Sequence, residues 1–267
     1  MRFTSFTLAA LAAVSLSACD ALTTDPNNIA FAFNPDDDGT SLNTTTFFRD
    51  RGERIVITPN KNGDITLLSD RSFDKGQIES LSTIDDSSLA FVIRTDDSSA
   101  IVAVGRDPTG QAYVGSVVGR YAEVVMPETG NINFQGDYAG FLRNNETDQV
   151  VRFVNGTAVV VAQFAANETY GAILNRELRF TDDNSLDTIL TLENITLEPT
   201  AIDGNGQFAG NATGGEILDG TTTGASRYGG YVSGGAAADE IIGAVIMEHG
   251  GVGTLDLTET GIFIAKR

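Results

Sequence analysis

The chain has 267 residues, a net charge of −19 at neutral pH, one cysteine and one histidine. A surface this acidic repels nucleic acid and anionic lipid and favours cationic partners. A single cysteine excludes disulfide bonds within the chain, and a single histidine with no spare cysteine excludes the usual zinc sites. The 29 glycines and 6 prolines, with β-branched and aromatic residues in short runs, indicate strands and tight turns, so we expect an all-β protein.

The N-terminus has the pattern of a secretory signal peptide. Arg2 precedes an apolar run that is too short to cross a bilayer as a helix, which takes about 20 residues. The run ends in LSAC at residues 16–19, which resembles the bacterial lipobox. We therefore predict a signal peptide over residues 1–18 and lipidation of Cys19. A plain secreted protein with a free cysteine is the alternative.

Residues 19–50 are expected to form the lipid anchor and a polar tether, which includes one short strand over residues 29–33. Two or more acyl chains hold a protein durably at a membrane, so we expect a lipid-anchored protein of the cell envelope, at the outer membrane or the cell surface. Asp20 leaves the choice of membrane open, because aspartate at this place resembles an inner-membrane retention signal of enteric bacteria.

An acidic cluster in the tether matches the first half of a calcium-binding EF-hand loop that would start at Asn34. The twelfth position, where such a loop has a bidentate glutamate, is Thr45. No helices are predicted on either side of it. We therefore predict a solvated loop and no metal site.

Regular strand signals begin near Arg54. Short alternating runs separated by turn residues predict an antiparallel sheet, and residues 51–128 are expected to form a small β domain. A helical turn or two is expected only around residues 77–81. The predicted strands are ERIVITP, GDITLLS, SLAFVIRT, SAIVAVG, QAYVGSVVGR and YAEVVMP.

The second half, residues 129–267, follows a proline- and glycine-containing break and shows regularly spaced glycines. Eight or nine strands with hairpin-length links suit a closed, eight-stranded antiparallel barrel, because closure removes exposed sheet edges. The strands are too short for a membrane-spanning barrel and tryptophan is absent, so a water-soluble barrel is expected. The predicted strands cover residues 132–142, 150–154, 157–165, 169–175, 189–197, 206–213, 227–232, 241–247 and 261–265.

This second half carries glycine and aromatic motifs in a fixed order. They are GDYAG at 136–140, GTAVVVAQF at 156–164, GAI at 171–173, GQFAGN at 206–211, GGYV at 229–232, ADEIIGAV at 238–245 and GIFIAKR at 261–267. With the lipobox, this set resembles the β-barrel domain of the transferrin-binding protein B family of bacterial surface lipoproteins. The chain departs from the family after Tyr231, where SGGAAA at 233–238 replaces the usual aromatic-glycine-proline turn.

The resemblance implies a binding module in which residues 51–128 form a handle-like or ligand-facing domain before the barrel. The ligand would be a protein or a small molecule, with an iron- or haem-bearing one among the options. Tyr228, Tyr231 and His249 are candidate ligand-binding residues, and the histidine is expected at an exposed hairpin tip. An adhesin or envelope scaffold, with the barrel as a structural or export element, is the alternative. We expect no cofactor and no nucleic-acid partner.

No catalytic arrangement stands out in the sequence. His249 would have to serve any Ser-His-Asp triad, yet it lies among turn-forming glycines, and no G-x-S-x-G nucleophile elbow occurs. The glycines of residues 204–210 miss the dinucleotide-binding spacing by one residue, and no helix is predicted after them. We therefore expect binding rather than catalysis.

Overall fold

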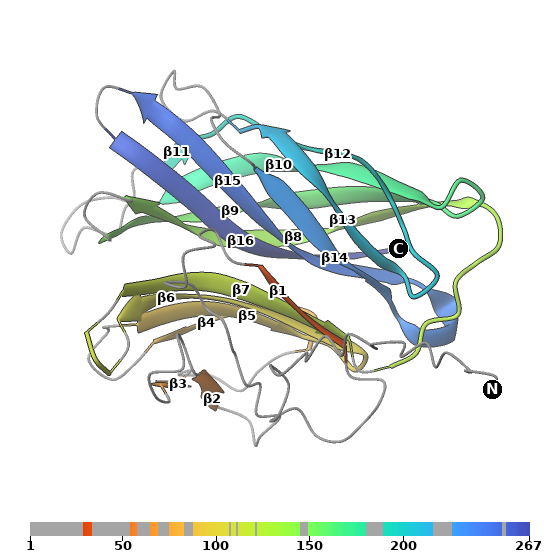
Figure 1. Cartoon of the computed structure of the whole chain (residues 1–267), viewed down its shortest axis with the longest axis horizontal. Coiled ribbons are helices and arrows are strands. Elements are labelled where there is room, and N and C mark those ends of the chain that lie inside the picture. Colours follow the sequence, from red (N-terminus) through yellow and green to blue (C-terminus); the bar gives the residue numbers. More distant parts are fainter. Residues whose placement is uncertain are drawn as a thin grey trace, which may run out of the picture.

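The structure, a computed structural model, describes residues 29–33, 54–57, 65–68, 75–82, 88–106, 108–110, 112–120, 122–144, 149–179, 189–215, 226–252 and 255–267. Within these ranges the protein is all-β, as predicted, and consists of two antiparallel sheets (Figure 1). Cys19, Asp20 and the acidic cluster that follows Asn34 lie outside the described residues.

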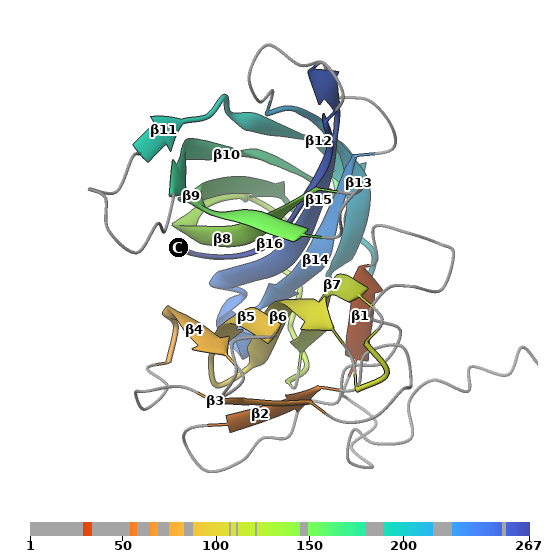
Figure 2. The ribbon, with the colours of Figure 1, turned by 90° about the vertical axis from the view of Figure 1, so that its left-hand side faces the viewer.

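The first sheet, here called the handle sheet, has the strand order β1-β7-β6-β5-β4-β3-β2. The stretch expected as a tether supplies β1, which pairs along its whole length with β7. The strands β2 and β3 fold beneath the far side of the sheet (Figure 2). The strands are β1 (Ile29–Phe33), β2 (Arg54–Ile57), β3 (Ile65–Leu68), β4 (Ile78–Ser82), β5 (Ser88–Arg94), β6 (Ser98–Arg106) and β7 (Ala112–Arg120).

The second sheet closes into the predicted eight-stranded barrel. Its ring runs β8-β9-β10-β12-β13-β14-β15-β16 and returns from β16 to β8, with every pair antiparallel. The short β11 pairs with the end of β10. The strands are β8 (Asn131–Asn144), β9 (Gln149–Gln163), β10 (Glu168–Arg179), β11 (Ile189–Thr191), β12 (Ile195–Ala201), β13 (Gln207–Gly214), β14 (Arg227–Ser233), β15 (Glu240–Val252) and β16 (Leu255–Lys266), with a 3-10 turn, η2 (Gly235–Ala237), before β15.

The barrel is filled by a close-packed apolar core. Large aromatic side chains such as Phe134, Phe208 and Phe263 point inward and are almost fully buried. Val124 and Met126, from the segment that links the two sheets, pack against this core. The interior is therefore packed with side chains, as in other small barrels.

A second apolar layer lies between the handle sheet and the outside of the barrel. Phe91 of β5 stacks on Phe141 of β8, with ring centroids 4.7 Å apart. Ile242 of β15 and Ile262 of β16 belong to the same layer. These barrel strands are consequently buried on both faces. Their sequences therefore contain continuous runs of apolar residues and do not alternate between apolar and polar ones.

The GDYAG motif is explained by the space that its tyrosine needs. Tyr138 points into the barrel and lies across β16, where a Cβ added at Gly261 would come within 2.4 Å of the phenolic oxygen. Gly261 is paired with Gly140, at which a Cβ would also be 3.0 Å from that oxygen. Glycine is required at Gly261 because a large aromatic ring occupies the place of its side chain.

Three expectations about local structure are wrong. Residues 77–81 do not form a helical turn, because β4 begins at Ile78. The run expected as a strand near residues 121–127 contains no strand over its described residues 122–127, and Val125 is 64 % exposed. The two strands expected over residues 150–165 are one, β9, which passes without a break through Asn155 and Gly156.

Candidate binding cleft

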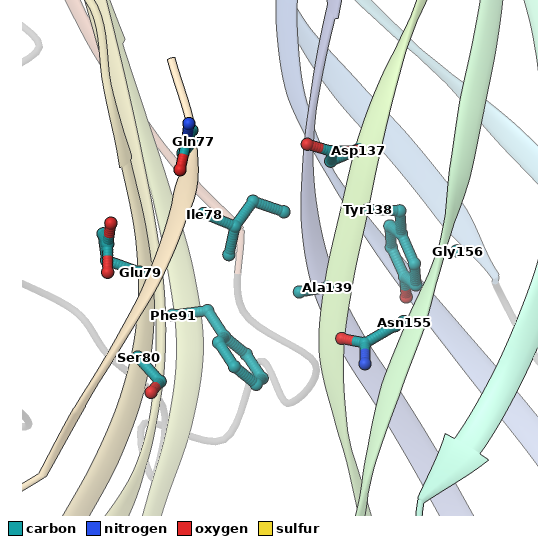
Figure 3. A pocket seen from close by; sticks show the side chains of 10 residues that line it. All are labelled: Gln77, Ile78, Glu79, Ser80, Phe91, Asp137, Tyr138, Ala139, Asn155 and Gly156. Carbon is teal, nitrogen blue, oxygen red and sulfur yellow. The ribbon is translucent and has the colours of Figure 1, made fainter. Parts of the chain in front are cut away.

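A cleft of about 730 Å³ opens between one edge of the handle sheet and the outside of the barrel (Figure 3). Residues 77–80 and Phe91 line it on the handle side. Residues 137–139 of β8 and residues 155–156 of β9 line it on the barrel side. Its size falls within the range of about 300–1,000 Å³ that is usual for ligand sites, which often lie between domains.

The floor of the cleft is apolar. Ile78 and Phe91 project from the handle sheet toward the barrel, and Ala139 faces them from β8 (Figure 3). All three belong to the apolar layer between the two sheets, with Ile78 at its partly buried margin. The cleft is thus the place where this layer opens to solvent.

Polar side chains surround that floor. Asp137 and Asn155 point from the barrel wall toward the handle sheet, and Gln77 lies at the start of β4 (Figure 3). Gln77 and Ser80 are exposed. The side chain of Glu79 points to the opposite face of the handle sheet (Figure 3). An apolar floor with a few polar groups is the usual composition of a ligand site.

The pairing of β4 is described fully on one side only. The strand pairs with β5 over its whole length, from Ile78 to Ser82. On its other side β3 pairs with it at one position only, Leu68 with Ser82. The residues that link these two strands, 69–74, lie outside the described residues, so the partner of the outer edge of residues 78–81 is not described.

The barrel wall behind the cleft contains a buried polar network. Asp137 faces the cleft, while the next residue, Tyr138, points into the barrel and donates a hydrogen bond of 2.7 Å to Glu259 Oε1. Arg176 Nη2 forms an ion pair with Glu259 Oε2, and both side chains are fully buried. Arg176 Nη1 also donates to the carbonyl oxygens of Glu193 and Gly215.

The electrostatics of this network keep Glu259 ionised. Burial alone would raise its pKa, but the Arg176 guanidinium, the nearby His249 and the Tyr138 hydroxyl lower the pKa to about 2. Burial and the Glu259 carboxylate raise the pKa of Tyr138 well above its ordinary value. Tyr138 is therefore neutral and Glu259 anionic at neutral pH, and the charge pair makes the network neutral overall.

Two polar contacts fix the handle sheet to the barrel on either side of the apolar layer. Arg120, at the end of β7, lies 5.4 Å from the ring centroid of Tyr231 and donates to the carbonyl oxygens of Asn205 and Val232. Glu240 accepts hydrogen bonds from the hydroxyls of Thr95 and Ser98 in the β5–β6 turn. Both contacts join the handle sheet to the barrel, and none of their residues lines the cleft.

The three candidate ligand-binding residues predicted from the sequence lie away from this cleft. The Tyr228 side chain is fully buried in the barrel, and its hydroxyl donates to the carbonyl oxygen of Glu198 at 2.5 Å. The Tyr231 ring is fully buried in the layer beneath the handle sheet, and burial raises its pKa to about 12. Whether either residue contacts a ligand stays a prediction.

His249 is not at an exposed hairpin tip, so that expectation is wrong. The β15 strand continues past the histidine to Val252, and His249 is paired with Leu257 of β16. The side chain is 4 % exposed, with Nε2 3.5 Å from Glu259 Oε2. Neither ring nitrogen has a hydrogen bond to the described residues. A ligand role for His249 stays a prediction.

No group of His, Cys, Asp and Glu side chains suited to a metal ion occurs within the described ranges. Those ranges also contain no helix that is long and apolar enough to cross a bilayer.

The cleft residues were not found by sequence reasoning. Asp137 lies within the GDYAG motif, but the resemblance of that motif rests on its tyrosine and glycines. Phe91 and Ile78 are apolar residues of ordinary strands. The available signal was the alternation of β8, which places Asp137 and Ala139 on the face opposite to Tyr138, but it does not say what that face meets.

Comparison with solved structures finds proteins of similar fold. The chain aligns with a tryptophan-to-alanine mutant of the vaccine antigen transferrin binding protein B from Haemophilus parasuis Hp5, with a TM-score of 0.51 and 15 % identity over 89 % of this chain and 45 % of that one. A double mutant of the same protein aligns with a TM-score of 0.49 and 11 % identity, over 90 % of this chain and 44 % of that one. Intact Ap-TbpB, with its N and C lobes, aligns with a TM-score of 0.45 and 12 % identity, over 90 % of this chain and 46 % of that one.

The first of these likenesses supports the predicted resemblance at the level of the fold. This chain spans less than half the length of each of these proteins. No protein-family model matches the chain. Comparison with curated proteins also gives no match.

Proposed function

We propose that this chain is a cell-envelope binding module that holds a protein ligand in the cleft between the handle sheet and the barrel. The observation that carries the proposal is the cleft, with an apolar floor and polar walls. A protein of similar fold is named for binding transferrin. For this chain we infer only the broader class of ligand, a protein, and no catalytic role.

A protein ligand fits the lining better than an iron- or haem-bearing small molecule does. Iron and haem are held by side chains such as histidine, cysteine, methionine or tyrosine. None of the first three occurs among the described lining residues, and the ring of Tyr138 points into the barrel. The amides of Gln77 and Asn155 supply hydrogen-bonding groups that can pair with a polypeptide backbone.

The proposal includes anchoring through lipidated Cys19 after removal of residues 1–18, with display at the outer membrane or cell surface. Radiolabelled palmitate should enter the wild-type chain and not the Cys19→Ser variant. Protease added to intact cells should remove the wild-type chain while a periplasmic control protein survives. Protection of the chain would place it in the periplasm and favour Asp20 as a retention signal.

Site-specific photo-crosslinking in intact cells tests the cleft as the binding site. A photo-reactive amino acid replaces Gln77 or Ser80, which are exposed in the cleft, or Leu190 on β11, which is also exposed but outside it. We expect a discrete protein adduct from the two cleft positions only. Equal adducts from all three positions, or none from the cleft, would contradict the proposal, and adducts from Leu190 alone would favour the adhesin or scaffold alternative.

A further inference from the structure

Resting on the proposed function, we infer that the protein ligand anchors itself in the cleft with an aromatic side chain that carries a hydrogen-bond donor, a tyrosine or a tryptophan. Such side chains combine an apolar body with a polar tip, and they are enriched among the residues that dominate protein–protein binding energy. The cleft offers a matching surface to each part of the side chain.

The floor of the cleft adjoins an aromatic cluster. Phe91 stacks on Phe141 with ring centroids 4.7 Å apart, and Phe153 meets Phe91 edge-on at 5.8 Å. Phe91 is the member of this cluster that lines the cleft, beside Ile78 and Ala139. Because aromatic rings prefer stacked or edge-to-face neighbours, a ring of the ligand can join the cluster at Phe91.

The space over this floor is large enough for a ring. An apolar cavity of about 150 Å³ is enough to bind benzene, and the cleft has about 730 Å³. On the barrel wall Ala139 has a small side chain and Gly156 has none, so the wall leaves room for the ring. The remaining volume can hold the backbone that carries the aromatic side chain.

Two acceptors lie on the barrel wall beside this space. Asn155 is paired with Ala139 across the β8–β9 ladder, and Asp137 lies two residues, roughly 7 Å, before Ala139 on the same face of β8. Both side chains point toward the handle sheet (Figure 3). Neither forms a hydrogen bond or an ion pair within the part of the chain that the structure describes. They can therefore accept a hydrogen bond from a phenol O–H or an indole N–H.

Cations at the start of β4 favour an uncharged donor over a lysine or arginine of the ligand. Lys75 directly precedes Gly76 and Gln77, and a Cβ added at Gly76 would lie 2.6 Å from Lys266 Nζ. A cationic side chain of the ligand would meet like charge at this end of the cleft, whereas a phenol or an indole would not.

Amino-acid amides test the inference on the purified chain. The probes are N-acetyl-tyrosinamide and N-acetyl-tryptophanamide. The phenylalanine amide is the control without a donor, and the leucine amide is the control without a ring. In NMR titrations we expect both probes to shift the amides of Ile78, Phe91, Ala139 and Asn155 with a Kd on the order of a millimolar. The probes should bind about threefold to tenfold more tightly than either control.

The double variant Asp137→Ala with Asn155→Ala tests the acceptors. It should remove the preference for tyrosinamide over phenylalaninamide and leave the affinity for phenylalaninamide unchanged, which a general loss of structure would not do. The control is Glu128→Ala, which removes an exposed carboxylate that does not line the cleft and should keep the preference.

Equal affinities for the leucine and tyrosine amides, shifts confined to other parts of the chain, or a preference that survives the double variant would overturn the inference. Protein adducts from Gln77 and Ser80 without any preference among the amides would leave the proposed function standing and overturn the aromatic anchor alone.

Discussion

Arg176 and Glu259 form an ion pair in the interior of the barrel, where neither side chain has any exposed surface. Removing one partner of such a pair leaves an uncompensated buried charge, which costs about 3–5 kcal/mol. We therefore expect Arg176→Met to lower the free energy of unfolding by about that amount in urea denaturation. The double variant Arg176→Met with Glu259→Gln should recover a large part of the loss.

An exposed ion pair provides the matched control. Lys75 and Asp96 are paired in the handle sheet with more than half of each side chain exposed. Solvent screens such pairs, so Lys75→Met should change the unfolding free energy by less than about 1 kcal/mol. Equal losses for the two methionine variants would show that burial of the Arg176–Glu259 pair does not matter.

The acid sensitivity of the fold should depend on Glu259. Arg176, His249 and Tyr138 hold its pKa at about 2 despite its burial, against an ordinary value of 4.5. The carboxylate therefore stabilises the fold fully above pH 4.5, and that stability is lost as the pH falls toward 2. Unfolding curves between pH 6 and pH 3 should be less steeply pH-dependent for Glu259→Gln than for the wild type. An unchanged slope would contradict this assignment.

The contact between Glu240 and the β5–β6 turn predicts the opposite pH dependence. Burial raises the pKa of Glu240, and hydrogen bonds from Ser98 and Thr95 partly offset that rise. The stability linked to Glu240 is thus greatest at low pH and is lost as the pH rises through its raised pKa. Ser98→Ala should cost about 1–3 kcal/mol at pH 8 and much less at pH 4. In a Glu240→Gln background the cost should no longer depend on pH.

Gly261 should not tolerate a side chain. A Cβ there would lie about 2.5 Å from ring atoms of Tyr138, so Gly261→Ala should cost about 1–3 kcal/mol through overpacking. Gly204 is the control, because a Cβ added there would have nothing within 4 Å. Differential scanning calorimetry should show a lowered melting temperature for Gly261→Ala and little change for Gly204→Ala. Similar shifts for both would show that the ring can move aside.

The barrel should aggregate when the handle sheet is removed. Its outer wall contains Phe141, Ile262 and Ile264, which are buried only because the sheet covers them. Large exposed apolar patches promote association. A fragment of residues 122–267 should therefore bind an apolar dye such as ANS and elute as aggregates, while the longer chain elutes as one species. A monodisperse fragment without dye binding would show that the barrel is independent of the sheet.

Much of the fold could be predicted from local pattern. The strands around Tyr138 and Phe208 carry glycines where rings need space, and their predicted bounds lie within two residues of the observed ones. The strand around Phe263 was predicted to start at residue 261, six residues after its observed start at Leu255. The failures occur where local pattern is ambiguous. Ile78 and Leu81 have a helical spacing of three, yet they lie on opposite faces of a strand and pack in different apolar layers. The glycines after His249 suggested a turn, but β15 continues through them.

The cleft could not be predicted because it depends on which faces of two sheets meet. The side chains of Asp137 and Asn155 point toward Gln77 and Ile78, which lie more than fifty residues earlier in the chain. Nothing in the sequence around Asp137 or Asn155 indicates this contact. The buried network is hidden for the same reason. Glu259 lies in LDLTET at residues 255–260, just before the segment 261–265 that was predicted as a strand.

The pairing of β8 with β16 has a consequence for the order of folding. Tyr138 and Glu259, which these strands bring together, are 121 residues apart in the sequence, so the entropy of closing a long loop opposes their contact. The same two strands carry the outer surface on which the handle sheet packs. We therefore expect the sheet to have its complete docking surface only once the barrel has closed, and the cleft between them to form late in folding.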